Sequence, residues 1–273
     1  AANTFSNTFS INQGAVRIEK NSAFDNANRR ERYKAPAVKT SLPSENQALL
    51  LAMFRQLHSQ FDSTSGNIDG MGTLLPTSIQ ECFTQVASHP VLDEMTRQRA
   101  RTLISGNARA LLNSAAVDAI DGGFYTSRTD ANWSTVTLDR NGLMQTRAIQ
   151  SFAMIGQALD DASILEAAEK AMQFHEENFA LEGGLYANIA AISLMAKEAY
   201  CWRIETLKST LDASEFALLK HHYDWQEMGN VPPESDAQGE FFRLNLLVPK
   251  HDLADSAAHQ SITAQQAQAL LNS

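Results

Sequence analysis

The chain has 273 residues, of which 44% are hydrophobic and 19% are charged, and its formal net charge is −9. This length suffices for one large domain or two small ones with a substantial core. A nucleic-acid interface needs clustered Lys and Arg, so the acidic balance argues against nucleic acid as a partner. No apolar run approaches the roughly 20 residues that span a bilayer, so we expect a soluble chain without a transmembrane segment.

Residues 1–43 are rich in Asn, Ser, Thr and charged side chains, unlike the remainder. Such a segment buries too little apolar area to fold alone, which predicts an extended or disordered arm. A sharper hypothesis is that its apolar positions form strands added to a partner. The candidate partner-binding residues are Phe5, Phe9, Ile11, Val16 and Ile18. The Ala1-Ala2 start would suit cleavage after an export signal, which would place the chain in a periplasm or outside the cell.

Helical periodicity begins at Ser44, a good N-cap, and predicts one helical domain over residues 44–273. The first helix is expected to bury a stripe made of Leu49, Leu50, Met53, Phe54, Leu57 and Phe61. Further helices are expected from Pro76, over 93–120, 138–159 and 163–179, near 206–211, and over 212–223 and 261–271. A short turn joins 138–159 to 163–179, which indicates a helical hairpin, and Ser163 with Glu166 predicts its capping box.

Two loops about 60 residues apart share a glycine–aromatic pattern. They are Asp121-Gly122-Gly123-Phe124-Tyr125 and Glu182-Gly183-Gly184-Leu185-Tyr186. This period fits a helical hairpin plus a loop in each repeat, which favours a toroid or solenoid. We expect both loops at one end of the molecule, and one glycine of each pair with positive φ as a helix C-cap.

Further motifs follow the two loops in a fixed order. Asp130 and Trp133 come after the first loop, and Tyr200, Trp202, Glu205 and Leu207 after the second. From about Ser44 to Asp255 this order resembles the helical-toroid part of the thioredoxin-domain-containing family of the spermatogenesis-associated type. That family's α/α barrel is similar to N-acylglucosamine 2-epimerases. The resemblance implies an all-α toroid in which Gly122, Gly123, Gly183, Gly184, Trp133 and Trp202 are structural.

The chain also departs from the family pattern. After the first loop the family carries a His-Phe-Glu-Lys-Met-Leu-Tyr-Asp string, of which only Asp139-Arg140 keeps the charge pattern here. After the second loop its Asp-Ala-Asp is replaced by Ala190-Ala191-Ile192. No thioredoxin-like domain precedes Ser44, and the expected helices are too few for a closed ring. We therefore expect an incomplete toroid whose cavity has lost carboxylates that could bind a sugar or transfer protons.

Two functions remain open. The first is a non-catalytic helical scaffold or accessory subunit that contacts other protein subunits in a homo- or hetero-oligomer, possessing no cofactor. Its flank near Phe241, Phe242, Leu244 and Leu247 is then expected to be partly buried by another chain or by the arm. The alternative is a sugar-binding or epimerase-like enzyme with Tyr125, Arg128, Asp130, Trp133, Asp139, Arg140 and Tyr186 around a cavity.

The remaining residues with chemical potential have simpler explanations. His175 is a weak acid–base candidate, and stabilisation by the helix dipole near a helix end explains it equally simply. His221 and His222 diverge on a helix and lack a third ligand at zinc spacing. Cys82 and Cys201 are expected to be buried, inert thiols.

Overall fold

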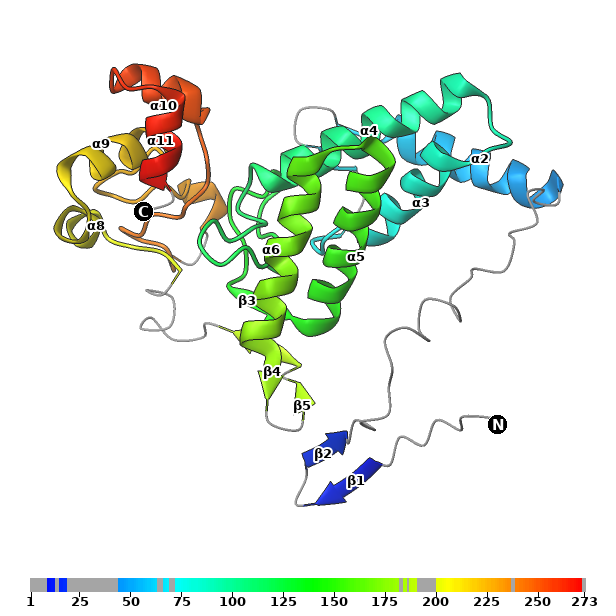
Figure 1. Cartoon of the computed structure of the whole chain (residues 1–273), viewed down its shortest axis with the longest axis horizontal. Helices are drawn as coiled ribbons and strands as arrows, with labels where there is room; N and C mark the ends of the chain where they lie inside the picture. Colours follow the sequence, from blue (N-terminus) through cyan, green and yellow to red (C-terminus); the bar gives the residue numbers. More distant parts are fainter. Residues whose placement is uncertain are drawn as a thin grey trace.

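A computed structural model describes residues 9–12, 15–18, 44–62, 66–68, 72–181, 184–185, 187–190, 200–236 and 239–271. Helices dominate these ranges, and α2 to α6 form a main bundle beside a smaller group made of α8 to α11 (Figure 1). The helices are α2 (Ser44–Ser59), α3 (Thr77–Ser88), α4 (Glu94–Leu112), α5 (Gly142–Leu159), α6 (Ala162–Phe179), α8 (Ile204–Thr210), α9 (Ala213–His222), α10 (Leu253–His259) and α11 (Ala264–Leu271). The strands are β1 (Phe9–Asn12), β2 (Ala15–Ile18), β3 (Asp139–Asn141), β4 (Ala180–Leu181), β5 (Gly184–Leu185) and β6 (Asn188–Ala190), and a 3-10 turn spans Pro233–Ser235.

The main bundle consists of two helical hairpins, α3–α4 and α5–α6, joined because α3 also packs against α5. Apolar residues at helical spacing form one contiguous core, including Phe83 of α3, Ile104 of α4 and Phe152 of α5. The predicted hairpin over 138–179 is confirmed as α5–α6, and the mainly helical fold is confirmed. The toroid arrangement stays a prediction. No helix within the described ranges has both the length and the apolar character needed to cross a bilayer.

Two helix boundaries differ from the sequence-based prediction. Helix α4 ends at Leu112 and does not reach Ile120, because the Asp118 carboxylate accepts hydrogen bonds from the backbone of Ile120 and Asp121 and holds a turn. Helix α5 begins at Gly142, four residues later than predicted. The residues before it form β3, which pairs with β6 in antiparallel register. A turn held by a side chain at the first boundary, and strand pairing at the second, thus override the apolar periodicity.

The caps and the apolar stripes need similar corrections. Asp161, not Ser163, is the N-cap of α6, and its side chain accepts from the backbone N–H of Ser163 and Ile164. In α2 only Phe54 of the predicted stripe is fully buried, while Leu49 and Met53 are 61% and 47% exposed. Helix α2 packs against α3 over a small contact area. Most of the predicted apolar stripe of α2 therefore has no packing partner within the described chain.

The C-terminal group has two small cores of its own. Tyr223 and Trp225 pack with Ile204 of α8, and Leu218 of α9 packs with small residues of α10 and α11. The predicted cap of α11 is confirmed, since Thr263 Oγ1 accepts from the Gln266 backbone at 3.2 Å. Helix α10 was not predicted, because at seven residues it is too short to show a clear period.

The expected apolar flank is largely closed by the chain itself. Phe241 and Leu244 are buried in the main core, and Leu247 packs on the core around Trp225. Only Phe242 is widely exposed, at 62%. The expectation that another chain or the arm covers this flank is therefore wrong for Phe241 and Leu244, whereas Leu247 is only partly buried. Residues 241–243 form a turn, and Asn245 beyond it forms an antiparallel bridge with Trp202.

The arm contains a short β-hairpin. Strands β1 and β2 pair with each other, with Phe9 opposite Ile18 and Ile11 opposite Val16. Strand β2 also lies beside β5 (Figure 1). The arm is therefore not extended throughout, and its two strands have a partner within the chain. Phe5 lies outside the described residues, and a partner-binding role for all five apolar positions stays a prediction.

The first glycine loop has the predicted positive φ, but for a different reason. Gly122 has φ +75° in a tight turn ten residues past the end of α4, so it is not a helix C-cap. Its amide donates to the Asp118 carbonyl at 2.9 Å. In the second loop Gly183 lies outside the described residues. Gly184 belongs to β5, so it is not a helix C-cap.

Substituting Gly122 with alanine should destabilise the fold. A Cβ there would lie 2.7 Å from Lys170 Cβ and would sit in a left-handed backbone conformation. We expect a loss of about 1–3 kcal/mol in urea unfolding. Gly72→Ala is the matched control, because nothing lies within 4 Å of its position, and should change stability little. Equal effects of the two substitutions would contradict this account of the turn.

Candidate functional site

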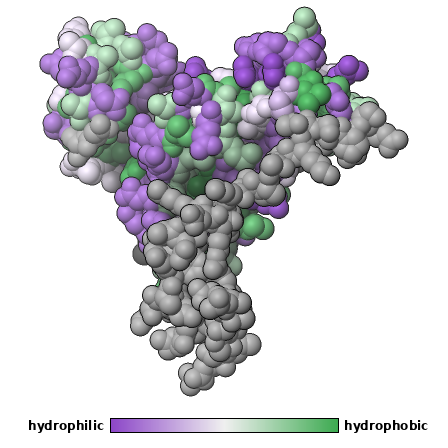
Figure 2. Space-filling view, turned by 45° about the vertical axis from the view of Figure 1, so that its right-hand side comes forward, coloured by the Kyte–Doolittle hydropathy of each residue, from purple (hydrophilic) through white to green (hydrophobic). Residues whose placement is uncertain are grey.

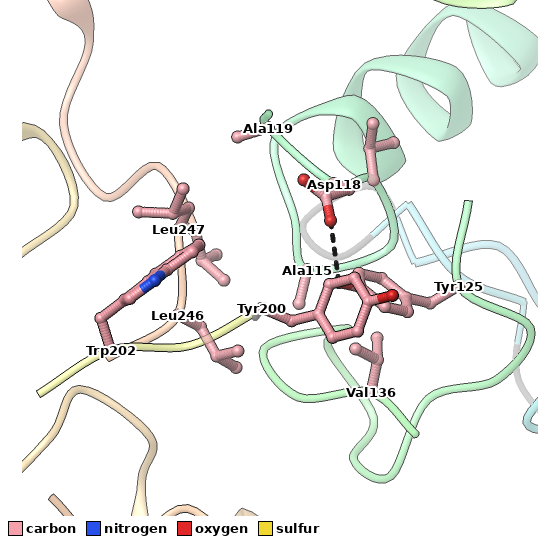
Figure 3. Close-up of a pocket in the computed structure, with 11 residues that line it drawn as sticks. Ala115, Asp118, Ala119, Tyr125, Val136, Tyr200, Trp202, Leu246 and Leu247 are labelled. Atoms are coloured by element: carbon pink, nitrogen blue, oxygen red, sulfur yellow. Dashed lines mark hydrogen bonds between the residues drawn. The ribbon is translucent and has the colours of Figure 1, made fainter. Parts of the chain in front are cut away.

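The loop over 114–125 brings an acid and a phenol together. It folds back on itself through a bridge between Val117 and Phe124, and the Tyr125 amide donates to the Ala116 carbonyl at 2.9 Å. One carboxylate oxygen of Asp118 accepts from the backbone of the turn, which leaves Oδ2 facing the ring of Tyr125. The Tyr125 hydroxyl donates to that Oδ2 at 3.1 Å (Figure 3).

Arg140 of β3 enters this loop as a buried cation. It is only 2% exposed, and its Nη2 donates to Asp118 Oδ2 and, over 3.0 Å, to the Tyr125 hydroxyl. The guanidinium carbon also lies 4.5, 4.5 and 4.7 Å from the ring centroids of Tyr125, Phe174 and Tyr200. A desolvated guanidinium against aromatic faces gains cation–π stabilisation. We call these five residues, Asp118, Tyr125, Arg140, Phe174 and Tyr200, the arginine cage.

The charged and polar groups of the cage shift one another's pKa. Burial on its own lowers the pKa of Arg140, but the oxygens of Tyr125 and Asp118 outweigh it and leave that pKa raised. Burial, reinforced by Asp118, raises the pKa of Tyr125 well above its usual range. Arg140 therefore stays charged and Tyr125 stays a neutral donor at ordinary pH. The geometry is that of a buried ion pair between Arg140 and Asp118, to which the neutral Tyr125 adds a hydrogen bond.

A pocket lies beside the cage. Asp118, Tyr125 and Tyr200 line one side, and Trp202 and Leu246 line the other (Figure 3). Its volume is about 20 Å³ on a scale where one water molecule needs roughly 10–15 Å³. Between the described residues this pocket has room for one water molecule and is far too small for a sugar ring.

Three of the predicted site residues lie in a different loop, away from this pocket. The Asp130 carboxylate accepts from the backbone of Asn132 and Ser134 and from the Thr135 hydroxyl. Burial raises the pKa of Asp130, but the hydrogen bonds from Ser134 and Thr135 prevail and lower it. Arg128 donates to the Ala131 carbonyl and, at 3.5 Å, to the Gly72 carbonyl. These contacts organise the loop.

Trp133 completes the same loop. It is 1% exposed, has φ +56°, and its Nε1 donates to Asn67 Oδ1 at 3.1 Å. Its carbonyl accepts from the Ala115 amide at 2.8 Å, which fixes the start of the segment that carries Asp118. The family motif of Asp130 and Trp133 thus supports the arginine cage from outside.

The other predicted residues do not join the cage. Asp139 accepts from the Thr137 hydroxyl, and His175 stacks on Phe179 with ring centroids 5.0 Å apart. Tyr186 lies outside the described residues. Of the predicted set, the structure brings only Tyr125 and Arg140 together. It adds Asp118, Phe174 and Tyr200, of which only Tyr200 carried a signal, through its place in the Tyr-x-Trp motif.

Neither thiol nor metal chemistry is indicated at the remaining positions. Cys201 is buried as predicted, whereas Cys82 is only half-buried, and burial raises the pKa of its thiol. Within the part of the chain that the structure describes, no group of three or more His, Cys, Asp or Glu side chains is placed to hold a metal ion.

Comparisons with known proteins connect this chain to one set of relatives. It is 23% identical to rat spermatogenesis-associated protein 20 over 249 residues, which is 85% of this chain and 31% of the relative. It is also 23% identical to the human protein of that name over 238 residues, or 81% of this chain and 30% of the relative. The chain thus spans about a third of the length of these relatives. No family model matches it.

Replacing Arg140 with methionine should unfold the protein more easily. The substitution leaves the Asp118 carboxylate buried without its cation, which typically costs about 3–5 kcal/mol. Arg109→Met is the control, since Arg109 pairs with Asp161 but is 64% exposed, and exposed pairs contribute little. Urea unfolding measures both. Losses of similar size would show that the cage is no more important than a surface ion pair.

Proposed function

We propose that this chain is a non-catalytic helical scaffold or accessory subunit that works through contacts with another protein. Support comes from large apolar side chains exposed at the end of the α5–α6 hairpin, next to the arginine cage. Contiguous exposed apolar surface on a folded protein indicates an interaction site. On the face shown in Figure 2, hydrophilic residues predominate and apolar ones form smaller patches.

The cluster begins on the β4–β5 ribbon. Leu181 is 43% exposed and Leu185 is 65% exposed. Leu181 pairs with Gly184 and Leu185 with Ala180, so the two leucines lie on opposite faces of the ribbon. The ribbon therefore cannot pack both leucines against the same neighbour, and both remain exposed within the described part of the chain.

Two further residues extend the cluster. Ile120 and Leu143 are each 64% exposed. Ile120 precedes Asp121, whose carboxylate lies 3.8 Å from Arg140, and Leu143 follows the β3 strand that carries Arg140. Strand β3 pairs with β6, just beyond the ribbon, and the Gly142 amide donates to the Ala187 carbonyl at 2.9 Å. We call Ile120, Leu143, Leu181 and Leu185 the apolar end.

Acidic residues border the apolar end. Asp121 is 47% exposed at its side chain. Its pKa is raised by burial, by Asp118 and by Glu177, with Arg140 opposing, which places Glu177 near it. These carboxylates share a single buried cation, Arg140. The excess of negative charge favours a partner that supplies Lys or Arg. We therefore propose a different, basic protein chain as the partner. A second copy of this chain, with net charge −9, suits the surface less well.

The resemblance to the spermatogenesis-associated type supports the same proposal. We propose that the helices are part of an α/α toroid related to N-acylglucosamine 2-epimerases. In this chain the interior positions are filled by the arginine cage and a water-sized pocket. The alternative, sugar binding or an epimerase-like reaction, rests on a carboxylate, a phenol and an indole around that pocket, contributed by Asp118, Tyr125 and Trp202. The pocket volume favours the scaffold.

A photo-cross-linking amino acid placed at position 185 tests the proposal. In extract of the source cells we expect one discrete protein adduct at 185, and little at the control position 91, where Val91 is 50% exposed far from the apolar end. Leu181→Ser should reduce the adduct several-fold through lost apolar contact, and Asp121→Lys should reduce it through lost charge complementarity. Equal labelling at 185 and 91, or an adduct indifferent to both changes, would contradict a docking site here.

The arm should contribute to the same association. Strand β2 lies beside β5, which carries Leu185, so removing residues 1–43 takes away a neighbour of the apolar end. We expect the truncated chain to give a weaker adduct at 185 while keeping the helical circular dichroism of the full chain. An undiminished adduct would remove the arm from the proposal.

A further inference from the structure

Three histidines from different segments stack on one another in the C-terminal group. His221 lies in α9, His251 in the extended segment before α10, and His259 at the end of α10. The His221 ring centroid is 4.4 Å from that of His251 and 4.1 Å from that of His259, with interplanar angles of 30° and 24°. His221 Nδ1 also lies 3.0 Å from Ser256 Oγ of α10. The central ring therefore connects α9 to both other segments.

We propose that this histidine stack is a pH-sensitive latch that holds α10 and α11 on α9 when its rings are neutral and loosens when they are protonated. Parallel imidazoles about 4 Å apart pack well as neutral rings. Two imidazolium cations at that distance repel each other, and the polar contact to Ser256 does not compensate both charges.

The groups around the stack set the balance of charge. Burial lowers the pKa of His221, and the neighbouring His259 and His251 lower it further, while Asp224 after α9 and Asp255 of α10 oppose this. Burial also lowers the pKa of His222, next to the stack; a backbone hydrogen bond at His251 and the Asp252 carboxylate oppose this, and the charge of His251 adds to it. Lys250 contributes a further cation next to His251 in the sequence, and residues 264–271 of α11 carry no charge. For His221 and His222 the balance favours the neutral ring.

Few other contacts hold α10 and α11 on α9. The core between α9, α10 and α11 has three buried hydrophobic residues, Leu218, Ala257 and Ala267, two of which are alanines. Leu253, Ile262 and Leu270 pack against this core and are only partly buried. Further ties are hydrogen bonds: the His222 carbonyl accepts from the Lys250 amide at 2.8 Å and the His251 amide at 3.2 Å, and Gln260 Nε2 donates to the Ala217 carbonyl at 3.4 Å. Repulsion within the stack therefore acts on a weakly packed interface, unlike the large core of the main bundle.

The direction of the pH dependence follows from linkage. A histidine whose pKa is lowered in the closed state binds more protons in the open state. The stability of the latch is then complete above the usual histidine pKa of about 6.5 and falls as the pH drops below it. A lowering of one pKa unit at one histidine corresponds to about a tenfold shift toward the open state at low pH.

Hydrogen exchange of the full chain tests the latch. Between pH 7.5 and 5.5, after correction for intrinsic exchange, we expect backbone protection in α9 and α10 to fall several-fold and protection in α5 to stay constant. The ratio between the two pH values should shrink toward one in His259→Gln and in His251→Gln, which remove the repulsion. His89→Gln, in the α3–α4 turn, is the matched control and should keep the wild-type ratio.

An NMR titration of the His221 ring provides the second readout, which does not depend on the stability of the variants. We expect His221 to titrate below the usual histidine value, and to move toward that value in His259→Gln. Protection in α10 that is the same at both pH values would overturn the proposal. So would a His221 titration at or above the usual value, or one unmoved by His259→Gln.

Discussion

A buried guanidinium is the constraint on which this fold depends most. Taking Arg140 out of water costs several kcal/mol, and the cost is offset only if a carboxylate, hydrogen-bond acceptors and aromatic faces are all in place. These groups come from distant parts of the chain: Asp118 and Tyr125 from one loop, Phe174 from α6, and Tyr200 from the start of the C-terminal group. The cation thus makes the bundle, the loop and the later segments interdependent.

The same constraint bears on function. In a helical barrel that acts on small molecules, the space at the ends of the helices has to stay open. In this chain Arg140 packs among three aromatic rings, and the pocket beside them has room for a water molecule. We propose that function depends instead on the apolar end, which combines exposed leucines with an acidic border. The histidine stack likewise belongs to the surface of the C-terminal group.

Elements governed by local rules could be predicted from the sequence. Helix α3, the α5–α6 hairpin and the Thr263 cap follow from apolar spacing and capping chemistry. The end of α4 could not be predicted that way, because Asp118 satisfies the turn with its own side chain. Apolar spacing also puts Met95 on the core-facing side of α4, yet its side chain is 65% exposed. A period shows which face of a helix is apolar, but it does not show whether a partner covers that face.

Only part of the arginine cage could be predicted from the sequence. Tyr125 and Arg140 were singled out because a family motif and a charge pattern marked them, while Asp118 stood inside a segment whose period suggested a helix. Phe174 is a buried residue of α6 that no motif marked. What joins the five residues is a set of contacts over long sequence separations, and no local rule encodes such contacts. The motif residues Asp130 and Trp133 proved to support the loop that carries Asp118.

A double-mutant cycle between Arg140 and Asp118 tests the central claim most directly. Unfolding free energies would be measured by urea titration for Arg140→Met, Asp118→Asn and the two changes combined. If the rest of the fold depends on this buried pair, the coupling energy should be about 2–3 kcal/mol, with the double variant less destabilised than the sum of the single ones. A coupling energy within about 0.5 kcal/mol of zero would contradict the claim, because the two residues would then contribute independently.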